Sequence, residues 1–187
     1  MNRFRSTIAA LLLLMCTAPL CSQDAMTRLR LAQNFEQSNE WERAAALYAD
    51  LHLADPSNYV YYDGLLRSQT QLKQYPQAIT LVEKRMRLFP KDLLLHATLG
   101  GLWYDAGEEH TADSVWRTIF SVEPVNVGVY RVVAGEQMER RLLDRAIATY
   151  LAGRKATGNE ALFADELADC IPRCRNMPQP RGSLSAS

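Results

Sequence analysis

A spacing of 34 residues is the feature that most limits what this chain can fold into. Alanines recur at this spacing, and prolines follow them at the same spacing: Ala44, Ala78, Ala112 and Ala146, then Pro56, Pro90 and Pro124. Four residues after each alanine, one helical turn further along the same face, come Tyr48, Val82, Trp116 and Tyr150. A period of about 20 to 50 residues is typical of stacked repeat units. We therefore predict an all-α fold of repeated helix pairs.

The bounds of the helices follow from the same period. Each proline ends a helix because it lacks an amide donor and its ring clashes with the preceding turn. Two residues after each proline comes a side chain that can cap the next helix: Asn58, Asp92 and Asn126. We expect helix pairs at 25–38 and 41–54, 59–72 and 75–88, 93–106 and 109–122, and 127–140 and 143–156. The repeated alanines allow the two helices of each pair to approach closely.

These residues resemble the tetratricopeptide repeat (TPR), a helix-turn-helix unit, over residues 25–160. The third unit is closest to the family pattern, with Leu99, Gly100, Trp103, Gly107, Ala112, Trp116 and Pro124, and in the first unit Leu31, Ala32 and Phe35 occupy first-helix core positions. The resemblance implies a right-handed α-solenoid with units at 25–58, 59–92, 93–126 and 127–160. The fourth unit is degenerate, because Gly158 stands where the others have proline.

Both ends of the chain differ from the repeats. Residues 161–171 have an apolar stripe and an acidic face, so we predict a capping helix in the register of a fifth first helix. Residues 172–187 contain three prolines, three arginines and no acid, and we expect this tail to be disordered.

The first 22 residues have the layout of a secretory signal peptide: two arginines, a short apolar run and then small and polar residues. The apolar run is far shorter than the roughly 20 residues needed to span a bilayer. We therefore expect an exported protein, periplasmic or secreted, with cleavage after Ser22. The alternative is a lipid anchor at Cys21, although Leu20 stands where a lipoprotein signal has a small residue.

Charge and motifs disfavour nucleic-acid binding and catalysis. The chain has 21 basic and 21 acidic residues; the leader holds two arginines and the tail three, so residues 23–171 hold 16 basic and 21 acidic residues. Nucleic-acid binders normally have a basic excess. The histidines His52, His96 and His110 show no paired metal-ligand spacing, and there is no phosphate loop or nucleophile motif. We predict a non-enzyme without metal or cofactor.

Two cysteines near the end of the repeats leave one question open. Cys170 and Cys174 are four residues apart in a chain that we expect to be exported to an oxidising compartment. They form either a disulfide or two unpaired thiols, because this spacing is not specific.

The family resemblance also implies a concave groove lined by the first helix of each unit, at its second, fifth, ninth and twelfth positions. From these positions we select the following groove residues: Asp63, Arg67, Leu94, Ala97, Gly101, Tyr104, Arg131 and Met138. The middle of this groove is apolar with small residues, flanked by Arg67 and Arg131, which suits an extended, partly hydrophobic segment with an acidic group. Both arginines have the alternative of being solvated helix residues. The lysine, asparagine and arginine set of the chaperone-binding TPR clamp is absent.

These observations favour one function and leave a second open. The first is a non-catalytic interaction scaffold of the cell envelope that binds an extended peptide or a partner helix. The second is the docking part of a larger enzyme or signalling protein whose catalytic region lies elsewhere.

Overall fold

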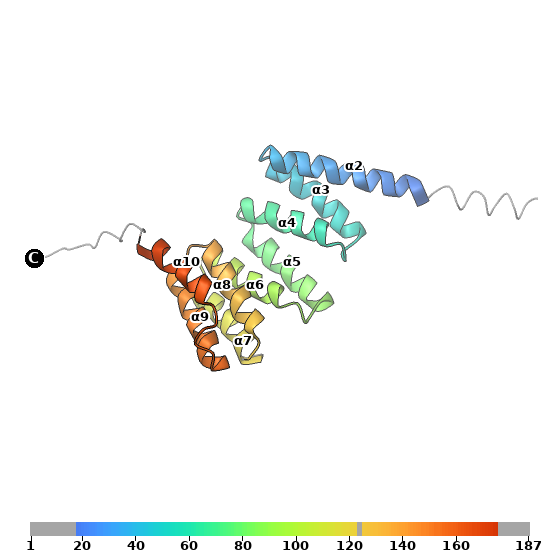
Figure 1. Cartoon of the computed structure of the whole chain (residues 1–187). Coiled ribbons are helices and arrows are strands. Elements are labelled where there is room, and N and C mark those ends of the chain that lie inside the picture. Colours follow the sequence, from blue (N-terminus) through green and yellow to red (C-terminus); the bar gives the residue numbers. More distant parts are fainter. Residues whose placement is uncertain (1–17, 123–124, 176–187) are drawn as a thin grey trace, which may run out of the picture. The chain divides into compact units, whose positions relative to one another are not determined.

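The protein is described by a computed structural model, which covers residues 18–122 and 125–175. These ranges contain nine α-helices and no strand: α2 (Ala18–Gln37), α3 (Trp41–Ala54), α4 (Tyr59–Gln71), α5 (Tyr75–Leu88), α6 (Leu93–Asp105), α7 (Glu109–Val122), α8 (Val127–Glu139), α9 (Leu143–Thr157) and α10 (Ala164–Arg175) (Figure 1). Helices α3, α5, α7 and α9 begin 34 residues apart, and so do α4, α6 and α8. The prediction of an all-α fold of TPR-type helix pairs is confirmed for these residues, whereas the right-handed winding stays a prediction.

The predicted capping residues begin three of the first helices. The side chains of Asn58, Asp92 and Asn126 accept hydrogen bonds of 2.9–3.0 Å from the backbone amides two residues further on. Each bond satisfies one of the amide donors that a helix start leaves without an intrahelical partner. Such a cap stabilises a helix by about 1 kcal/mol, which accounts for the regular helix starts.

The chain divides into two compact units, residues 1–81 and 82–187, with the boundary inside α5. In the first unit α3 packs against α2 and α4. Ala44 is fully buried, and the ring of Tyr48 lies so close to Gly64 that a Cβ there would be 2.3 Å from it. Small residues therefore let these helices approach, as the repeated alanines predict.

The second unit contains α6 to α10, in which α6 packs against α7, and α8 packs against α6 and α9. Its core contains the fully buried Ala112 and Val133 around Trp116. The indole Nε1 of Trp116 donates a hydrogen bond of 3.0 Å to the backbone oxygen of Ala97. A side chain at Gly100 would fill the space of this indole, so Gly100 is required for the contact.

Helix α10 differs from its predicted range of 161–171. It begins at Ala164 because the preceding residues form a turn, in which Asn159 caps the amide of Ala161 and Phe163 adopts a left-handed φ of 59°. It continues to Arg175, so the prediction of a disordered tail is wrong for residues 172–175; a proline inside a helix removes one hydrogen bond and does not always end it. Residues 176–187 lie outside the described residues.

α10 packs against α9 through one buried face. Phe163, Leu167 and Cys170 join a cluster with Tyr130 and Tyr150, and the rings of Tyr150 and Phe163 are 4.8 Å apart. This is how the first helix of a following repeat would pack.

Helix α2 has an exposed residue where we predict core. Leu31 is 43% exposed, although its equivalents at intervals of 34, Leu65, Leu99, Val133 and Leu167, are at most 8% exposed. The prediction that Leu31 is buried is wrong because no described helix precedes α2 to cover it.

The predicted leader lies mostly outside the described part of the chain. Residues 1–17 are not described, and residues 18–22 form the start of α2. Within the described ranges, every helix is too short or too polar to cross a membrane.

Candidate functional site

One position of the first helices combines exposure with apolar character. The second residue of the first three units is Met26, Val60 and Leu94, and each of these side chains is about half exposed. The corresponding residue of the fourth unit is Gly128. In the first unit Met26 and Val60 lie on α2 and α4, which contact each other. These side chains provide apolar contact area that the fold itself does not bury.

An arginine cluster joins the same two helices of the first unit. The Nε of Arg67 on α4 donates to Glu36 Oε1 on α2 at 2.7 Å, and its Nη1 pairs with Asp63 one turn earlier. Tyr48 OH donates to the other oxygen of Glu36 at 2.8 Å. The hydrogen bond from Arg67 holds the pKa of Glu36 below its usual value, while burial raises the pKa of Tyr48. Arg67 is thus already paired with two carboxylates.

A second arginine cluster lies in the second unit, on residues that the sequence analysis does not select. Arg140, directly after α8, pairs with Asp105 on α6 at 2.9 Å and with Glu136 on α8 at 2.6 Å. Its Nε also donates to the backbone oxygen of Gly101, and Thr98 donates to Glu136 at 2.8 Å. The Arg140 side chain is only 15% exposed. The spacing of Glu136 and Arg140, one helical turn apart, is the sequence signal that could have indicated this pair.

This second cluster corrects the predicted groove. Ala97 is fully buried, and its backbone oxygen binds Trp116. Gly101 is also buried, because the Arg140 guanidinium occupies the space where its Cβ would lie, 2.4 Å from Cζ. The expectation of an apolar middle with small residues is therefore wrong: between α6 and α8 lies a charged cluster, and neither Ala97 nor Gly101 contributes a surface.

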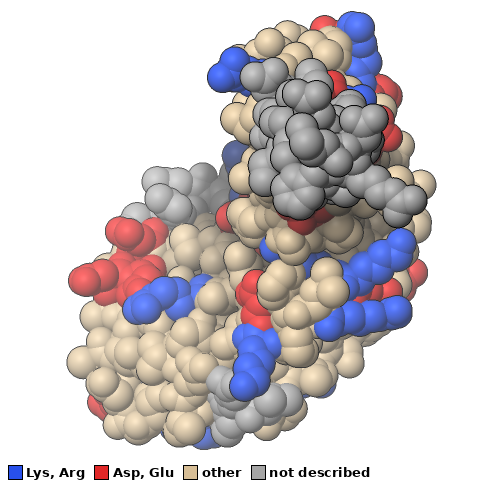
Figure 2. Space-filling view, turned by 90° about the vertical axis from the view of Figure 1, so that its right-hand side faces the viewer, with Lys and Arg blue, Asp and Glu red and all other residues tan. Residues whose placement is uncertain are grey.

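The remaining predicted groove residues take part in contacts within the second unit. Arg131 on α8 pairs with Glu166 on α10 at 3.1 Å and is more than half exposed. The Sδ of Met138 lies 3.8 Å from Tyr150 OH and 3.7 Å from Cys170 Sγ, next to the α10 cluster. The ring of Tyr104 lies beneath the guanidinium of Arg145, 5.3 Å from its Cζ. On the face drawn in Figure 2, acidic and basic side chains likewise lie close together at several places.

The described residues hold no group of three His, Cys, Asp or Glu side chains that could bind a metal ion. His52, His96 and His110 lie on three different helices, α3, α6 and α7. The side chain of Cys174 lies outside the described residues, so the disulfide with Cys170 and its alternative both stay predictions.

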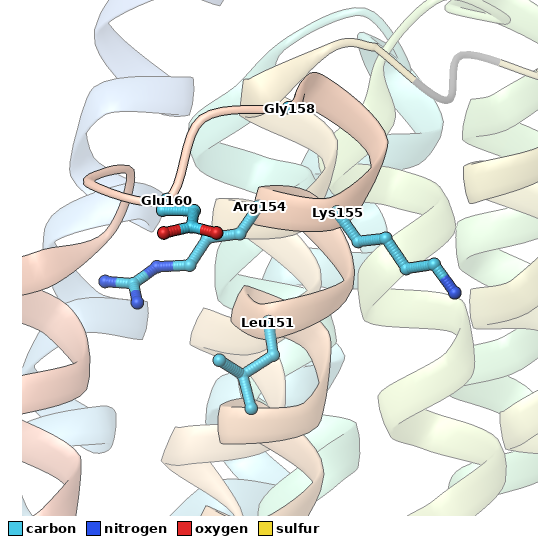
Figure 3. Close-up of a pocket in the computed structure, with 5 residues that line it drawn as sticks. All are labelled: Leu151, Arg154, Lys155, Gly158 and Glu160. Atoms are coloured by element: carbon cyan, nitrogen blue, oxygen red, sulfur yellow. The ribbon is translucent and has the colours of Figure 1, made fainter.

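A hollow of about 410 Å³ lies at the end of α9, lined by Leu151, Arg154, Lys155, Gly158 and Glu160 (Figure 3). Figure 3 shows the side chains of Arg154 and Glu160 close together, with Lys155 pointing away from them. The Nε of Arg154 donates to the backbone oxygen of Leu162 at 2.6 Å, which fixes the turn before α10. These residues serve the α9–α10 connection.

No model of a known protein family matches the chain, and no curated protein matches it either. Among solved structures, the chain is similar to a fragment of MamA from Desulfovibrio magneticus RS-1, with 14% identity and a TM-score of 0.49, over 81% of this chain and 85% of that one. It is also similar to a tetratricopeptide repeat protein from Parabacteroides merdae, with 11% identity and a TM-score of 0.49, over 81% of this chain and 58% of that one. At these identities and TM-scores the likenesses assign no function.

Proposed function

We propose that this chain is a non-catalytic protein-interaction scaffold that binds an extended peptide or a partner helix along the exposed faces of its first helices. The observation that carries the proposal is the recurrence of half-exposed apolar side chains at one repeat position: Met26, Val60 and Leu94. An exposed large apolar residue that recurs at a fixed position of a repeat provides contact area for a partner.

The charges beside these side chains revise the kind of partner that we expect. The sequence analysis assigns Arg67 and Arg131 to an acidic group of the ligand, but both arginines pair with carboxylates of the chain itself. Compensated charges contribute little affinity, since a ligand has to displace an existing ion pair. The contact should therefore depend mainly on the apolar side chains.

The compartment is part of the proposal. The layout of residues 1–22 supports export, and the scaffold would then act in the cell envelope, periplasmic or secreted, or lipid-anchored if Cys21 is modified. N-terminal sequencing of the mature protein separates these cases: a start after Ser22 supports cleavage there, and a modified Cys21 at the start supports the anchor.

Site-specific photo-crosslinking in the native cells tests the scaffold. A photoreactive residue at Val60 or Leu94 should capture a partner protein, because both side chains lie on first helices. The matched control is Leu53, which is 82% exposed at the end of the second helix α3. Equal capture at Leu53, or no capture at Val60 and Leu94, would contradict the proposal.

A further inference from the structure

The fourth unit has a buried polar pair where the other units have at least one large apolar residue. Gln137 on α8 and Thr149 on α9 are 5% and 6% exposed, and Thr149 Oγ1 donates to Gln137 Oε1 at 2.8 Å. The corresponding positions of the earlier units are Phe35 with Leu47, Gln69 with Leu81, and Trp103 with Val115. A polar pair at such a position costs free energy unless its hydrogen bonds are satisfied.

The pair lines a hollow on the second-helix side of the unit, away from the proposed first-helix contact. Its volume is about 210 Å³, and it is bounded by α7, α8 and α9 through the following residues: Asp113, Trp116, Arg117, Phe120, Gln137, Arg145, Ala148 and Thr149. Pockets for drug-sized ligands usually have about 300 to 1,000 Å³. This hollow therefore has room for one side chain rather than for a cofactor.

The polar atoms around the hollow leave hydrogen-bond donors in excess. Oε1 of Gln137 accepts from Thr149, whereas its amide nitrogen has no partner among the described residues. Arg117 at the rim is exposed and forms no ion pair with any described residue. The one acid of the lining, Asp113, pairs with Arg145 at 3.1 Å, and Glu109 pairs with the same guanidinium at 2.8 Å. A ligand group in the hollow thus meets an amide donor and an uncompensated guanidinium.

The walls add an apolar part to this site. Phe120 is partly buried, and Trp116 forms the base of the same wall, so methylene groups can pack beside the donors. Guanidinium groups bind carboxylates through paired hydrogen bonds, and an amide donor adds a third. A flexible acidic side chain, with two methylenes and a carboxylate, matches both the wall and the donors.

We infer that this hollow is an anchor pocket for a glutamate side chain of a partner protein. The carboxylate binds Arg117 and the amide nitrogen of Gln137, and the methylenes pack against Phe120. Anchors of this kind concentrate binding energy in a small buried pocket within a larger interface. The inference rests on the proposed function in one respect only, namely that the ligand belongs to a protein.

The test is a titration of the full chain with N-acetyl-glutamate N-methylamide, followed by ¹H–¹⁵N NMR. We expect saturable shifts of the Gln137 side-chain amide and the Arg117 Nε–H signals. The glutamine analogue has the same shape without the charge, and it should bind at least about tenfold more weakly. Equal shifts with both probes, or no shift with either, would overturn the inference.

Two variants locate the probe. Arg117→Gln should weaken its binding about tenfold or more, and Gln137→Leu with Thr149→Val should remove the amide donor while restoring an apolar pair. The matched control is Arg87→Gln, an exposed arginine on α5, which should bind the probe like the unmodified chain. Unchanged affinity in both pocket variants would overturn the assignment.

The titration is independent of the crosslinking experiment. Capture at Val60 and Leu94 without binding of the glutamate probe leaves the scaffold standing and removes the pocket. Probe binding without capture at those two positions does the reverse.

Discussion

The two arginine clusters have the same connections but different surroundings. In each unit one arginine pairs with an acid one turn earlier and with an acid of the preceding first helix: Arg67 with Asp63 and Glu36, and Arg140 with Glu136 and Asp105. The Arg67 side chain is 48% exposed, whereas that of Arg140 is 15% exposed and fills the space above Gly101. The same set of charges is therefore available at the surface in one unit and part of the packed structure in the other.

The largest expected effect comes from removing the more buried arginine. Arg140→Ala leaves the carboxylates of Asp105 and Glu136 without a cation, and breaking a buried ion pair costs about 3–5 kcal/mol. Chemical denaturation of the variant measures the loss in the free energy of unfolding. Arg87→Ala, at an exposed arginine of α5, is the control and should change it little. A loss under about 1 kcal/mol for Arg140→Ala would place this cluster with the exposed pairs.

The second prediction disturbs the same cluster from its other side. Gly101→Ala puts a Cβ into the space of the Arg140 guanidinium, which should cost about 1–3 kcal/mol of unfolding free energy. The control is Gly135→Ala, at the same position of the next repeat, where nothing lies within 4 Å of the added Cβ. That change should stabilise α8 by up to about 1 kcal/mol, because alanine is the better helix former. Equal effects at both glycines would show that Arg140 moves aside freely.

The third prediction concerns the exposed arginine. Arg67→Ala should lower the free energy of unfolding by about 0–1 kcal/mol, because solvent screens an ion pair at this exposure. Denaturation under the conditions used for Arg140→Ala gives the comparison directly. A loss as large as that of Arg140→Ala would abolish the distinction between the clusters.

The smallest expected effect is the pH dependence of the exposed cluster. The hydrogen bond from Arg67 lowers the folded pKa of Glu36 below its ordinary value of 4.5, so the carboxylate stabilises the fold above that pH. This contribution disappears as the pH falls through the folded pKa. The stability difference between the unmodified chain and Arg67→Ala should therefore be present at neutral pH and shrink in acid. A difference that grows below pH 4.5 would contradict the assigned sign.

The sequence predicts the helices well because their signals are local. The bounds of α3, α5 and α7 agree with the predictions to the residue, and those of α9 differ by one at its end. The caps at Asn58, Asp92 and Asn126 explain this agreement, since each acts on an amide two residues away. The start of α10 was less predictable, because a left-handed residue at Phe163 gives no local signal in the sequence.

The inner faces of the units are harder to predict, because their contacts join residues on successive helices. Arg140 and Asp105 are 35 residues apart, and the direction of the Arg140 side chain depends on the space left by Gly101. From sequence alone, Gly101 and Ala97 indicate a groove floor, whereas in the structure one is covered and the other is core. Side-chain reach, rather than repeat position, decides this part of the site.

The exposed Leu31 has a consequence for how the first unit opens. A core residue that no other helix covers contributes little to holding α2 in place, although its equivalents are buried at intervals of 34 residues. Local stability varies across a fold with the apolar contacts that each helix makes. The backbone amides of α2 should therefore exchange with deuterated solvent before those of α3, and proteases should first cleave the chain there.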